Sequence, residues 1–111
     1  MLITYANQKV EKYFTDYIKM QQKLPFEWVK AIKKQILYFK SSATFAEYLK
    51  LGLGKPHPLI NREGFYGIHI TPNIRLVVKP NLENNSIEIC QELEIEGVCD
   101  YHGNKENWYI P

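Results

Sequence analysis

Three consecutive residues near the C-terminus, Asp100-Tyr101-His102, bring a carboxylate, a phenol and an imidazole together in one short stretch. These side chains are among those that proteins use most often to give and take protons. In an extended segment alternate side chains point to opposite sides, so Asp100 and His102 should share one side and Tyr101 should occupy the other. The stretch is therefore a candidate centre for general acid–base chemistry.

Each candidate also has a purely structural explanation when it is taken alone. Asp100 could cap a turn, Tyr101 could anchor the core with its hydroxyl group at the surface, and His102 could be an exposed residue of the tail. His57 could simply open a strand, and His69 could be an ordinary histidine on the exposed face of one. A chemical role depends on whether the fold brings these residues together.

A cluster of imidazoles, a carboxylate, a phenol and cations would suit the cleavage of RNA by its own ribose 2′-OH. That reaction needs a base for the 2′-OH, positive charge for the crowded phosphate and an acid for the leaving 5′-oxygen. The candidates for base and acid are His57, Tyr101 and His102. If the last strand pairs with the strand before it, the neighbouring cations are Arg75 and Lys79. A requirement for the 2′-OH would restrict the activity to RNA.

Length and composition predict a single globular domain over residues 1–111. The chain is 45% hydrophobic and 23% charged, as expected of an ordinary folded protein. We expect no transmembrane helix and no signal peptide, because the chain lacks a long apolar run and the first residues lack a positive segment and a cleavage site. Cys90 and Cys99 lack the spacing of zinc ligands and should point to opposite faces of one strand. These features favour a reduced, cytoplasmic protein without a metal or a cofactor.

Charge is unevenly distributed, although the net charge is only +2. Residues 1–63 carry eleven Lys and Arg against five Asp and Glu, whereas residues 64–111 carry three against seven. A basic half could face nucleic acid. Lysines that are simply solvated on exposed helix faces would give the same pattern, so charge alone leaves both explanations open.

The N-terminal half has the pattern of a strand followed by a helical hairpin. Residues 1–5 suit a short strand. Apolar residues then recur at helical spacing over about residues 8–23 and again from Pro25 to Lys40, with a very short joint at Leu24. Residues 44–51 should add a helical turn closed by glycine. The exposed side of the second helix should carry four lysines: Lys30, Lys33, Lys34 and Lys40.

From Lys55 onward the apolar residues alternate, which is typical of strands. Strands are expected at residues 57–60, 65–71, 74–79 and 87–99, with a loop at 81–86 and a short tail from 104. Alternation places His69, Arg75 and Lys79 on the sheet face away from the helices. Gly97 interrupts the alternation, which predicts a bulge or bend. The predicted fold is α+β, with the N-terminal strand and two-helix hairpin packed on one face of a mostly antiparallel sheet of four to five strands.

The order of these parts resembles the RelE/ParE superfamily of toxin–antitoxin toxins, and within it the HigB-like branch of plasmid maintenance killer proteins. The resemblance covers nearly the whole chain. It rests on a lysine-rich helical hairpin followed by four motifs: His57-Pro58-Leu59, Gly64-Phe65-Tyr66-Gly67-Ile68-His69-Ile70, Ile74-Arg75-Leu76 and Asp100-Tyr101-His102. It implies a RelE-like fold.

This resemblance also implies a small cytoplasmic toxin that enters the ribosomal A site, cleaves mRNA without a metal and so inhibits translation. The motifs match family residues with catalytic roles at His57, Asp100, Tyr101 and His102. By this likeness His102 transfers a proton, Tyr101 positions or stacks on a base, and Asp100 orients the site. Arg75 matches a phosphate-binding arginine.

The partners that the resemblance implies are the ribosome with its mRNA and a cognate antitoxin. The antitoxin would be HigA-like, with a helix-turn-helix, and the toxin would meet operator DNA only through it. Arg62 and Lys79 are further candidates for contact with RNA phosphate. The four lysines of the second helix, Lys30, Lys33, Lys34 and Lys40, would contact either ribosomal RNA or the antitoxin.

Two other functions stay open on the same fold. ParE-like relatives inhibit DNA gyrase without catalysis, and they have no need of the histidines. A degenerate relative would only bind an antitoxin, or operator DNA together with it. The HigB-like branch usually has a lysine directly after His-Pro-Leu, where this chain has Ile60-Asn61, and that departure favours the degenerate relative.

Overall fold

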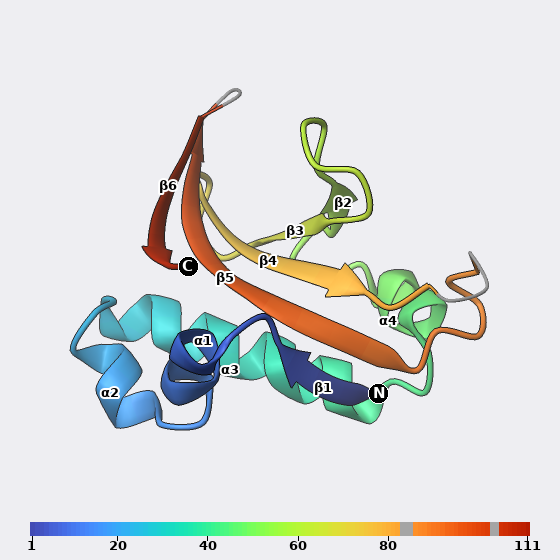
Figure 1. The fold of residues 1–111 in the computed structure, drawn as a ribbon, viewed down its shortest axis with the longest axis horizontal. Helices are drawn as coiled ribbons and strands as arrows, with labels where there is room; N and C mark the ends of the chain where they lie inside the picture. Colours follow the sequence, from blue (N-terminus) through green and yellow to red (C-terminus); the bar gives the residue numbers. More distant parts are fainter. Residues whose placement is uncertain (83–85, 103–104) are drawn as a thin grey trace.

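The computed structural model describes residues 1–82, 86–102 and 105–111, and in it a curved six-stranded sheet carries the helices on one face (Figure 1). The strands are β1 Leu2–Tyr5, β2 His57–Pro58, β3 Tyr66–His69, β4 Ile74–Pro80, β5 Glu92–His102 and β6 Lys105–Ile110. The helices are α1 Gln8–Phe14, α2 Tyr17–Gln21, α3 Phe26–Ser41 and α4 Phe45–Leu51. The α+β class predicted from the sequence is confirmed.

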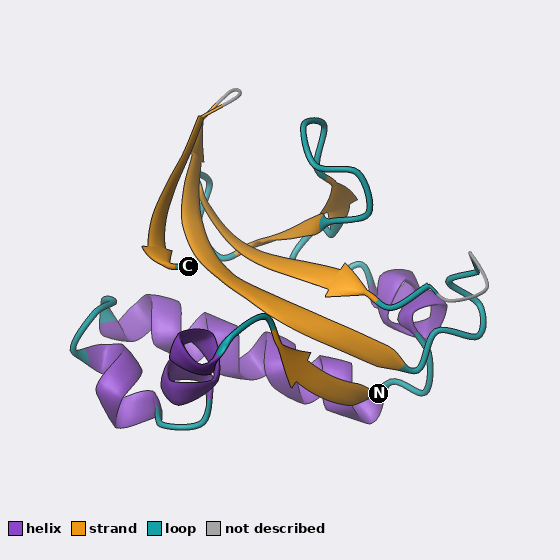
Figure 2. Ribbon diagram, in the orientation of Figure 1, coloured by secondary structure: helices purple, strands orange, loops and turns teal. Residues whose placement is uncertain are grey.

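The sheet is built around β5, its longest strand. Its order is β1-β5-β4-β3-β2, and all neighbours are antiparallel except β1, which runs parallel to β5. β4 lies along one edge of β5. The other edge is shared, because β1 pairs with residues 92–95 and β6 pairs with residues 98–102. Figure 2 shows the helices gathered below the sheet, while the far end of β5 rises beyond them together with β6.

The first predicted helix, residues 8–23, is wrong as a single element. The structure divides it into α1 and α2, because a second N-cap lies within it. Asn7 caps α1 by accepting a hydrogen bond from the backbone N–H of Val10, and Asp16 caps α2 by accepting one from Lys19. A capping side chain favours a helix start over continuation of the preceding helix.

The last predicted strand began too early. Residues 87–89 form a turn, and Ile89 is 58% exposed instead of facing the core. Backbone carbonyls of this segment accept hydrogen bonds from the start of α4. The N–H of Phe45 donates to the carbonyl of Cys90, and the N–H of Ala46 donates to the carbonyl of Ile87. The first N–H groups of a helix lack partners within it, so this segment satisfies them instead of extending the ladder. Residues 83–85 of the predicted loop lie outside the described residues.

The predicted C-terminal tail is in fact a strand. β6 pairs antiparallel with β5 from Val98 to His102, and Ile110 is fully buried. Its sequence, with Trp108, Tyr109 and Ile110 in a row, suits a strand, but its acidic and polar start gives no clear alternation. The first residue of the predicted tail, Asn104, and Gly103 before it lie outside the described residues.

The main core lies between the sheet and the helices. Its fully buried side chains come from all of the longer elements: Val10, Met20, Ile32, Phe39, Phe45, Tyr48, Ile68, Leu76, Val78, Leu93, Ile95 and Val98. The predicted inward faces of β3 and β4 are confirmed by this packing. We call this helix-covered side of the sheet the inner face, and the opposite side the outer face. Among the described residues, no helix is long and apolar enough to cross a membrane.

Candidate functional site

The outer face carries a second, small hydrophobic cluster beneath its polar side chains. Three buried residues form its centre, and three aromatic residues pack around them: Leu59, Val77 and Cys99, then Phe65, Tyr101 and Trp108. We call these six residues the outer cluster. Cys90 belongs to the main core instead, so the two cysteines lie on opposite faces of the sheet, as the sequence predicted, although Cys90 precedes the strand. The outer cluster forms the floor on which the candidate site is built.

Gly97 decides which residues of β5 reach the outer face. Val77 pairs with Gly97 but Val78 pairs with Ile95, so Glu96 is an extra residue and the strand bulges there. Before the bulge the odd-numbered residues Leu93 and Ile95 face the main core. After it the phase is reversed, and Cys99 and Tyr101 lie on the outer face. The bulge predicted at Gly97 is confirmed, and it is what turns Tyr101 outward.

Two histidines meet on the outer face, beside that cluster. The rings of His57 and His69 lie 5.2 Å apart, with their planes at 75°. His57 pairs with Gly67 across β2 and β3, and a Cβ at Gly67 would come within 3.3 Å of the His57 ring and 3.0 Å of Leu59. A side chain at Gly67 would therefore crowd the His57 ring.

The two histidines have different surroundings. Nδ1 of His57 lies 3.1 Å from the carbonyl oxygen of Lys55, and since a carbonyl only accepts, Nδ1 carries a hydrogen and donates it in this contact. Burial lowers the pKa of His69, and the positive charges of Arg75, His57 and Lys55 lower it further. His69 is therefore neutral at pH 7.

Arg75 lies next to His69 and is 9% exposed. Its Nη1 donates to the carbonyls of Thr71 and Ile74, at 3.0 and 3.2 Å, which fixes the guanidinium over the β3–β4 turn. Burial lowers the pKa of Arg75, but an arginine still keeps its charge. Because Arg75 pairs with Cys99 on β5, it shares the outer face with Tyr101.

Asp100 and His102 lie on one side of β5, as alternation predicted, and the structure shows that this is the inner side of the sheet. Asp100 pairs with Ile74, whose side chain belongs to the main core, and Tyr101 between them faces outward. Nδ1 of His102 lies 3.0 Å from Oδ1 of Asp100. The pair occupies the end of β5 that rises beyond the helices (Figure 1), and 59% of the His102 side chain is exposed. The predicted catalytic run is thus divided between the two sides of one strand.

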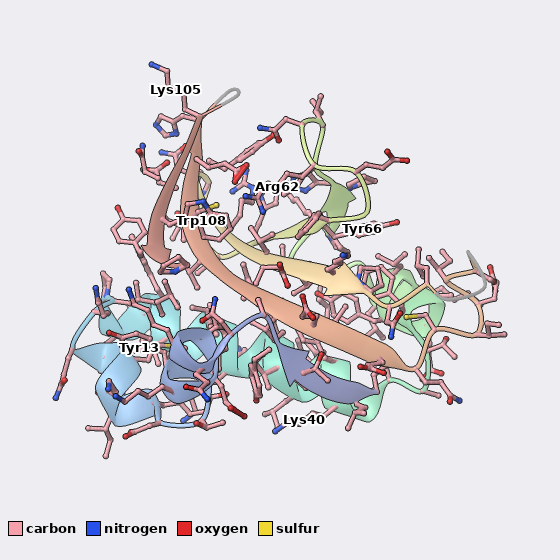
Figure 3. The ribbon with its side chains drawn as sticks, in the orientation of Figure 1. Tyr13, Lys40, Arg62, Tyr66, Lys105 and Trp108 are labelled. Carbon is pink, nitrogen blue, oxygen red and sulfur yellow. The ribbon has the colours of Figure 1, made fainter. Side chains whose placement is uncertain are left out.

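Tyr101 and Arg62 link the C-terminal hairpin to the loop between β2 and β3, residues 59–65. The hydroxyl group of Tyr101 donates to Oδ1 of Asn61 at 3.2 Å. Nε of Arg62 lies 3.1 Å from Oε1 of Glu106, and its guanidinium lies over the rings of Phe65 and Trp108 at 5.2 and 5.3 Å. Figure 3 shows Arg62 and Trp108 together at this point.

Lys79 lies farther along the same face. It pairs with Glu94, and its Nζ lies 5.3 Å from the centre of the Phe65 ring. It is four positions from Arg75 along β4, so about 13 Å of strand lies between them. Burial and the nearby Glu94 carboxyl raise the pKa of Glu96 to about 8. The positive charges of Lys79 and Arg62 lower this pKa, but their effect is smaller. This stretch of the outer face therefore carries a neutral Glu96 at pH 7.

The four predicted contact lysines belong to α3, in the layer on the other side of the sheet. All four are exposed: Lys30, Lys33, Lys34 and Lys40. Lys33 lies 5.1 Å above the ring of Tyr17, and Figure 3 shows Lys40 pointing away from the molecule. These lysines form a basic surface that is separate from the histidines and Tyr101.

Sequence reasoning missed several residues that the fold brings to this site. His69 was placed on the right face but left out of the catalytic set. Asn61 was missed because its contact depends on the β2–β3 loop meeting Tyr101 of β5, and Glu106 and Trp108 were missed because theirs depend on β6 pairing with β5. The aromatic run at the C-terminus is the one signal that could have indicated a strand there. Across residues 1–82, 86–102 and 105–111, no three His, Cys, Asp or Glu side chains come close enough to hold a metal ion.

Comparison with solved structures connects this geometry with known toxins. The YoeB/ParE toxin from Agrobacterium tumefaciens is 25% identical and has a TM-score of 0.57, with 92% of this chain and 99% of that one covered. YoeB from Staphylococcus aureus is similar both as a dimer, at 25% identity and a TM-score of 0.56, and in its complex with YefM, at 26% and 0.55. These comparisons cover 92% of this chain and 97% and 98% of theirs.

No protein-family model and no curated protein matches the sequence. The solved neighbours are YoeB and ParE toxins, so the HigB-like branch stays a prediction. The predicted fold and the predicted superfamily, however, agree with these neighbours over nearly their whole length. The fold and the neighbours together support the assignment of this chain to the RelE/ParE superfamily of toxins from toxin–antitoxin systems.

Proposed function

We propose that this protein is the toxin of a type II toxin–antitoxin system and a ribosome-dependent endoribonuclease that cleaves mRNA through its own 2′-OH. The observation that carries the proposal is the meeting of His57, His69, Arg75 and Tyr101 on the one sheet face without helices. A base and a fixed cation are two of the groups that this reaction needs, and an aromatic ring beside them can stack on a base of the RNA. The likeness to YoeB toxins supports the same class of activity.

His69 is the base that we propose for the 2′-OH. Its lowered pKa keeps the imidazole neutral at pH 7, and the ring of His57 lies beside it, 5.2 Å away between ring centres. Arg75 is charged and already held by two carbonyls, so it can meet a phosphate without reorganising. Tyr101 stacks on or orients a base from the floor of the site.

His102 is the proton donor that we propose for the leaving 5′-oxygen, with Asp100 orienting its ring. Oδ1 of Asp100 lies 3.0 Å from Nδ1 of His102, so the carboxylate can hold the ring in one orientation. Because His102 follows Tyr101 directly at the end of β5, RNA that crosses this end of the sheet can contact both sides of the strand. Arg62 and Lys79 add positive charge along the outer face.

The partner that we propose is a cognate antitoxin, in a cytoplasmic setting. The structure of YoeB in complex with YefM supports a protein partner for this fold. The exposed lysines of α3, Lys30, Lys33, Lys34 and Lys40, form a basic surface apart from the catalytic face. They are suited to an acidic surface of the antitoxin or to ribosomal RNA.

Primer extension on an mRNA held in purified translating ribosomes tests the proposal. The wild-type protein should cut at the codon in the A site. His69→Gln and His102→Ala should each slow cleavage by about 10²–10⁴-fold, the usual contribution of a general acid or base. With His69 as the base, the acidic limb of the cleavage profile should rise with pH through a pKa below the ordinary 6.5.

The proposal fails if the folded wild-type protein leaves the message uncut at high concentration. Loss of DNA supercoiling in treated cells, with growth inhibition unchanged in His57→Ala and His102→Ala, would identify a gyrase inhibitor instead. A folded protein that binds its antitoxin but inhibits nothing would identify a binding-only relative.

A further inference from the structure

The C-terminal strand β6 forms one wall of the outer face, although the sequence gives it no catalytic residue. Across the β5–β6 ladder, Glu106 is the partner of Tyr101 and Trp108 is the partner of Cys99. Cross-strand partners lie side by side on the same face, about 4.5–5.5 Å apart at Cβ. Glu106 and Trp108 are therefore next to the aromatic floor of the candidate site.

β5 is shaped to accept this strand. Gly97 has a φ of +147°, and a Cβ at this position would lie 1.9 Å from the carbonyl oxygen of Ile110. Ile110 itself is fully buried in the main core. Only a glycine lets the end of β6 approach so closely, so the strand is a fixed part of the fold.

Glu106 and Trp108 hold Arg62 of the β2–β3 loop in a defined orientation. The Glu106 carboxylate binds Nε, while Trp108 and Phe65 each meet the guanidinium. Glu106 is largely buried, with 11% of its side chain exposed, whereas Arg62 keeps 38%. The exposed part of Arg62 helps to line a hollow of about 200 Å³, together with Trp108 and Glu96.

The charge of this hollow suits an anion. Glu106 binds Arg62 through Nε, so the rest of the planar guanidinium can pair with the oxygens of a phosphate. Glu96, the carboxyl group at the same hollow, has a pKa of about 8 and does not repel an anion at pH 7. A guanidinium fixed in this way loses little side-chain entropy when it binds.

We propose that Glu106 is a positioning residue that orients Arg62 over the outer cluster, so that its exposed edge binds a phosphate group of the RNA. This inference rests on the proposed function in one respect, that RNA is the substrate. Glu106 acts only through Arg62 and does not touch RNA itself.

The test is a pair of isosteric substitutions that remove the same charge from two places. Glu106→Gln removes the ion pair, and Glu63→Gln removes the charge of an exposed glutamate adjacent to Arg62 in the loop. Simple electrostatics predicts that either loss of negative charge strengthens the binding of RNA. If Glu106 instead positions Arg62, Glu106→Gln should weaken the binding of RNA, whereas Glu63→Gln should not.

The probe is a short single-stranded RNA with 2′-O-methyl groups, which the proposed reaction cannot cleave. We expect Glu106→Gln to weaken its binding roughly tenfold, as one oriented charge-assisted contact would, and Glu63→Gln to bind at least as tightly as the wild type.

The Nε–H signal of Arg62 in ¹⁵N-labelled protein, assigned with Arg62→Lys, should be protected from exchange in the wild type and shift with RNA. It should lose its protection in Glu106→Gln. In the Arg62→Lys background, Glu106→Gln should change RNA binding little, because lysine lacks the Nε that Glu106 holds.

Equal or tighter binding of RNA by folded Glu106→Gln would overturn the inference. If that variant does not fold, Glu106→Asp, which keeps the charge but shortens the reach, must weaken binding for the inference to stand. Binding with a shift at Arg62 but without cleavage on ribosomes would refute the proposed activity and leave the inference standing. Full cleavage by Glu106→Gln would refute the inference and leave the proposed activity standing.

Discussion

The two faces of the sheet use the same strands in different ways. On the inner face, helices cover Ile68, Leu76, Val78 and Ile95, and each of these side chains is fully buried. On the outer face the buried hydrophobic centre is small, with Leu59, Val77 and Cys99 under a single layer of aromatic and charged side chains. The inner face supplies most of the hydrophobic stabilisation, since that scales with the apolar area removed from water.

The difference shows how one sheet can be both a scaffold and a site. The outer residues are fixed by contacts between loops and strand ends: Tyr101 with Asn61, Arg62 with Glu106, and Arg75 with the β3–β4 turn. These contacts orient polar groups without covering them. A substrate can therefore reach the outer face, whereas helices cover the inner face except at the end of β5, where His102 is exposed.

Two adjacent valines on β4 allow a direct comparison of the faces. Val77 and Val78 are both fully buried, but Val77 belongs to the outer cluster and Val78 to the main core. We expect Val78→Ala to lower the free energy of unfolding by about 2–3 kcal/mol and Val77→Ala by about 1 kcal/mol, because the thin outer layer can collapse into the space. Urea denaturation of both variants measures the difference. Equal losses would contradict the distinction between the faces.

Gly97→Ala tests the bulge that assigns residues to the two faces. The new methyl group would meet the carbonyl of Ile110, and a φ of +147° is strained for any residue with a side chain. We expect a loss of stability of about 1–3 kcal/mol and displacement of β6. Loss of the protected Nε–H signal of Arg62 would report that displacement. An unchanged spectrum and unchanged stability would show that the bulge does not depend on glycine.

Glu96 should make the stability of the fold depend on pH. Its pKa in the folded protein is about 8, against 4.5 in the unfolded chain. Between these values the folded state holds a proton that the unfolded state has released, so this contribution to stability is present at low pH and is lost as pH rises from 4.5 through 8. Glu96→Gln should remove that decline, whereas Glu88→Gln, at an exposed turn position, should retain it. Denaturation midpoints of both variants and the wild type, measured from pH 5 to 9, test this. The same decline in Glu96→Gln as in the wild type would contradict the raised pKa of Glu96.

Local patterns in the sequence predicted much of the fold. Alternation in β3 and β4 placed Ile68 and Leu76 inward and His69 and Arg75 outward, and the structure confirms this. The pattern was less informative where a side chain has two uses. Asp16 fits a helix surface as well as an N-cap, and Ile89 fits an alternating strand although the segment instead satisfies the start of α4.

The site was predictable to the extent that it depends on alternation along single strands. His57, Arg75 and Tyr101 were recognised as candidates, and the separation of Tyr101 from Asp100 and His102 follows from the period of a strand. The meeting of His57 with His69 depends on how β2 pairs with β3, which alternation within each strand does not give.

By itself, the sequence determined the α+β class, the apolar faces of the central strands and the presence of an irregularity at Gly97. Each depends on residue type and short spacing, which set local backbone preference and burial. Only the tertiary structure decided that the bulge turns Tyr101 to the outer face, and that β6 brings Glu106 to Arg62. These contacts join residues about forty positions apart, and their existence depends on strand register, which is fixed by the packing of the whole sheet.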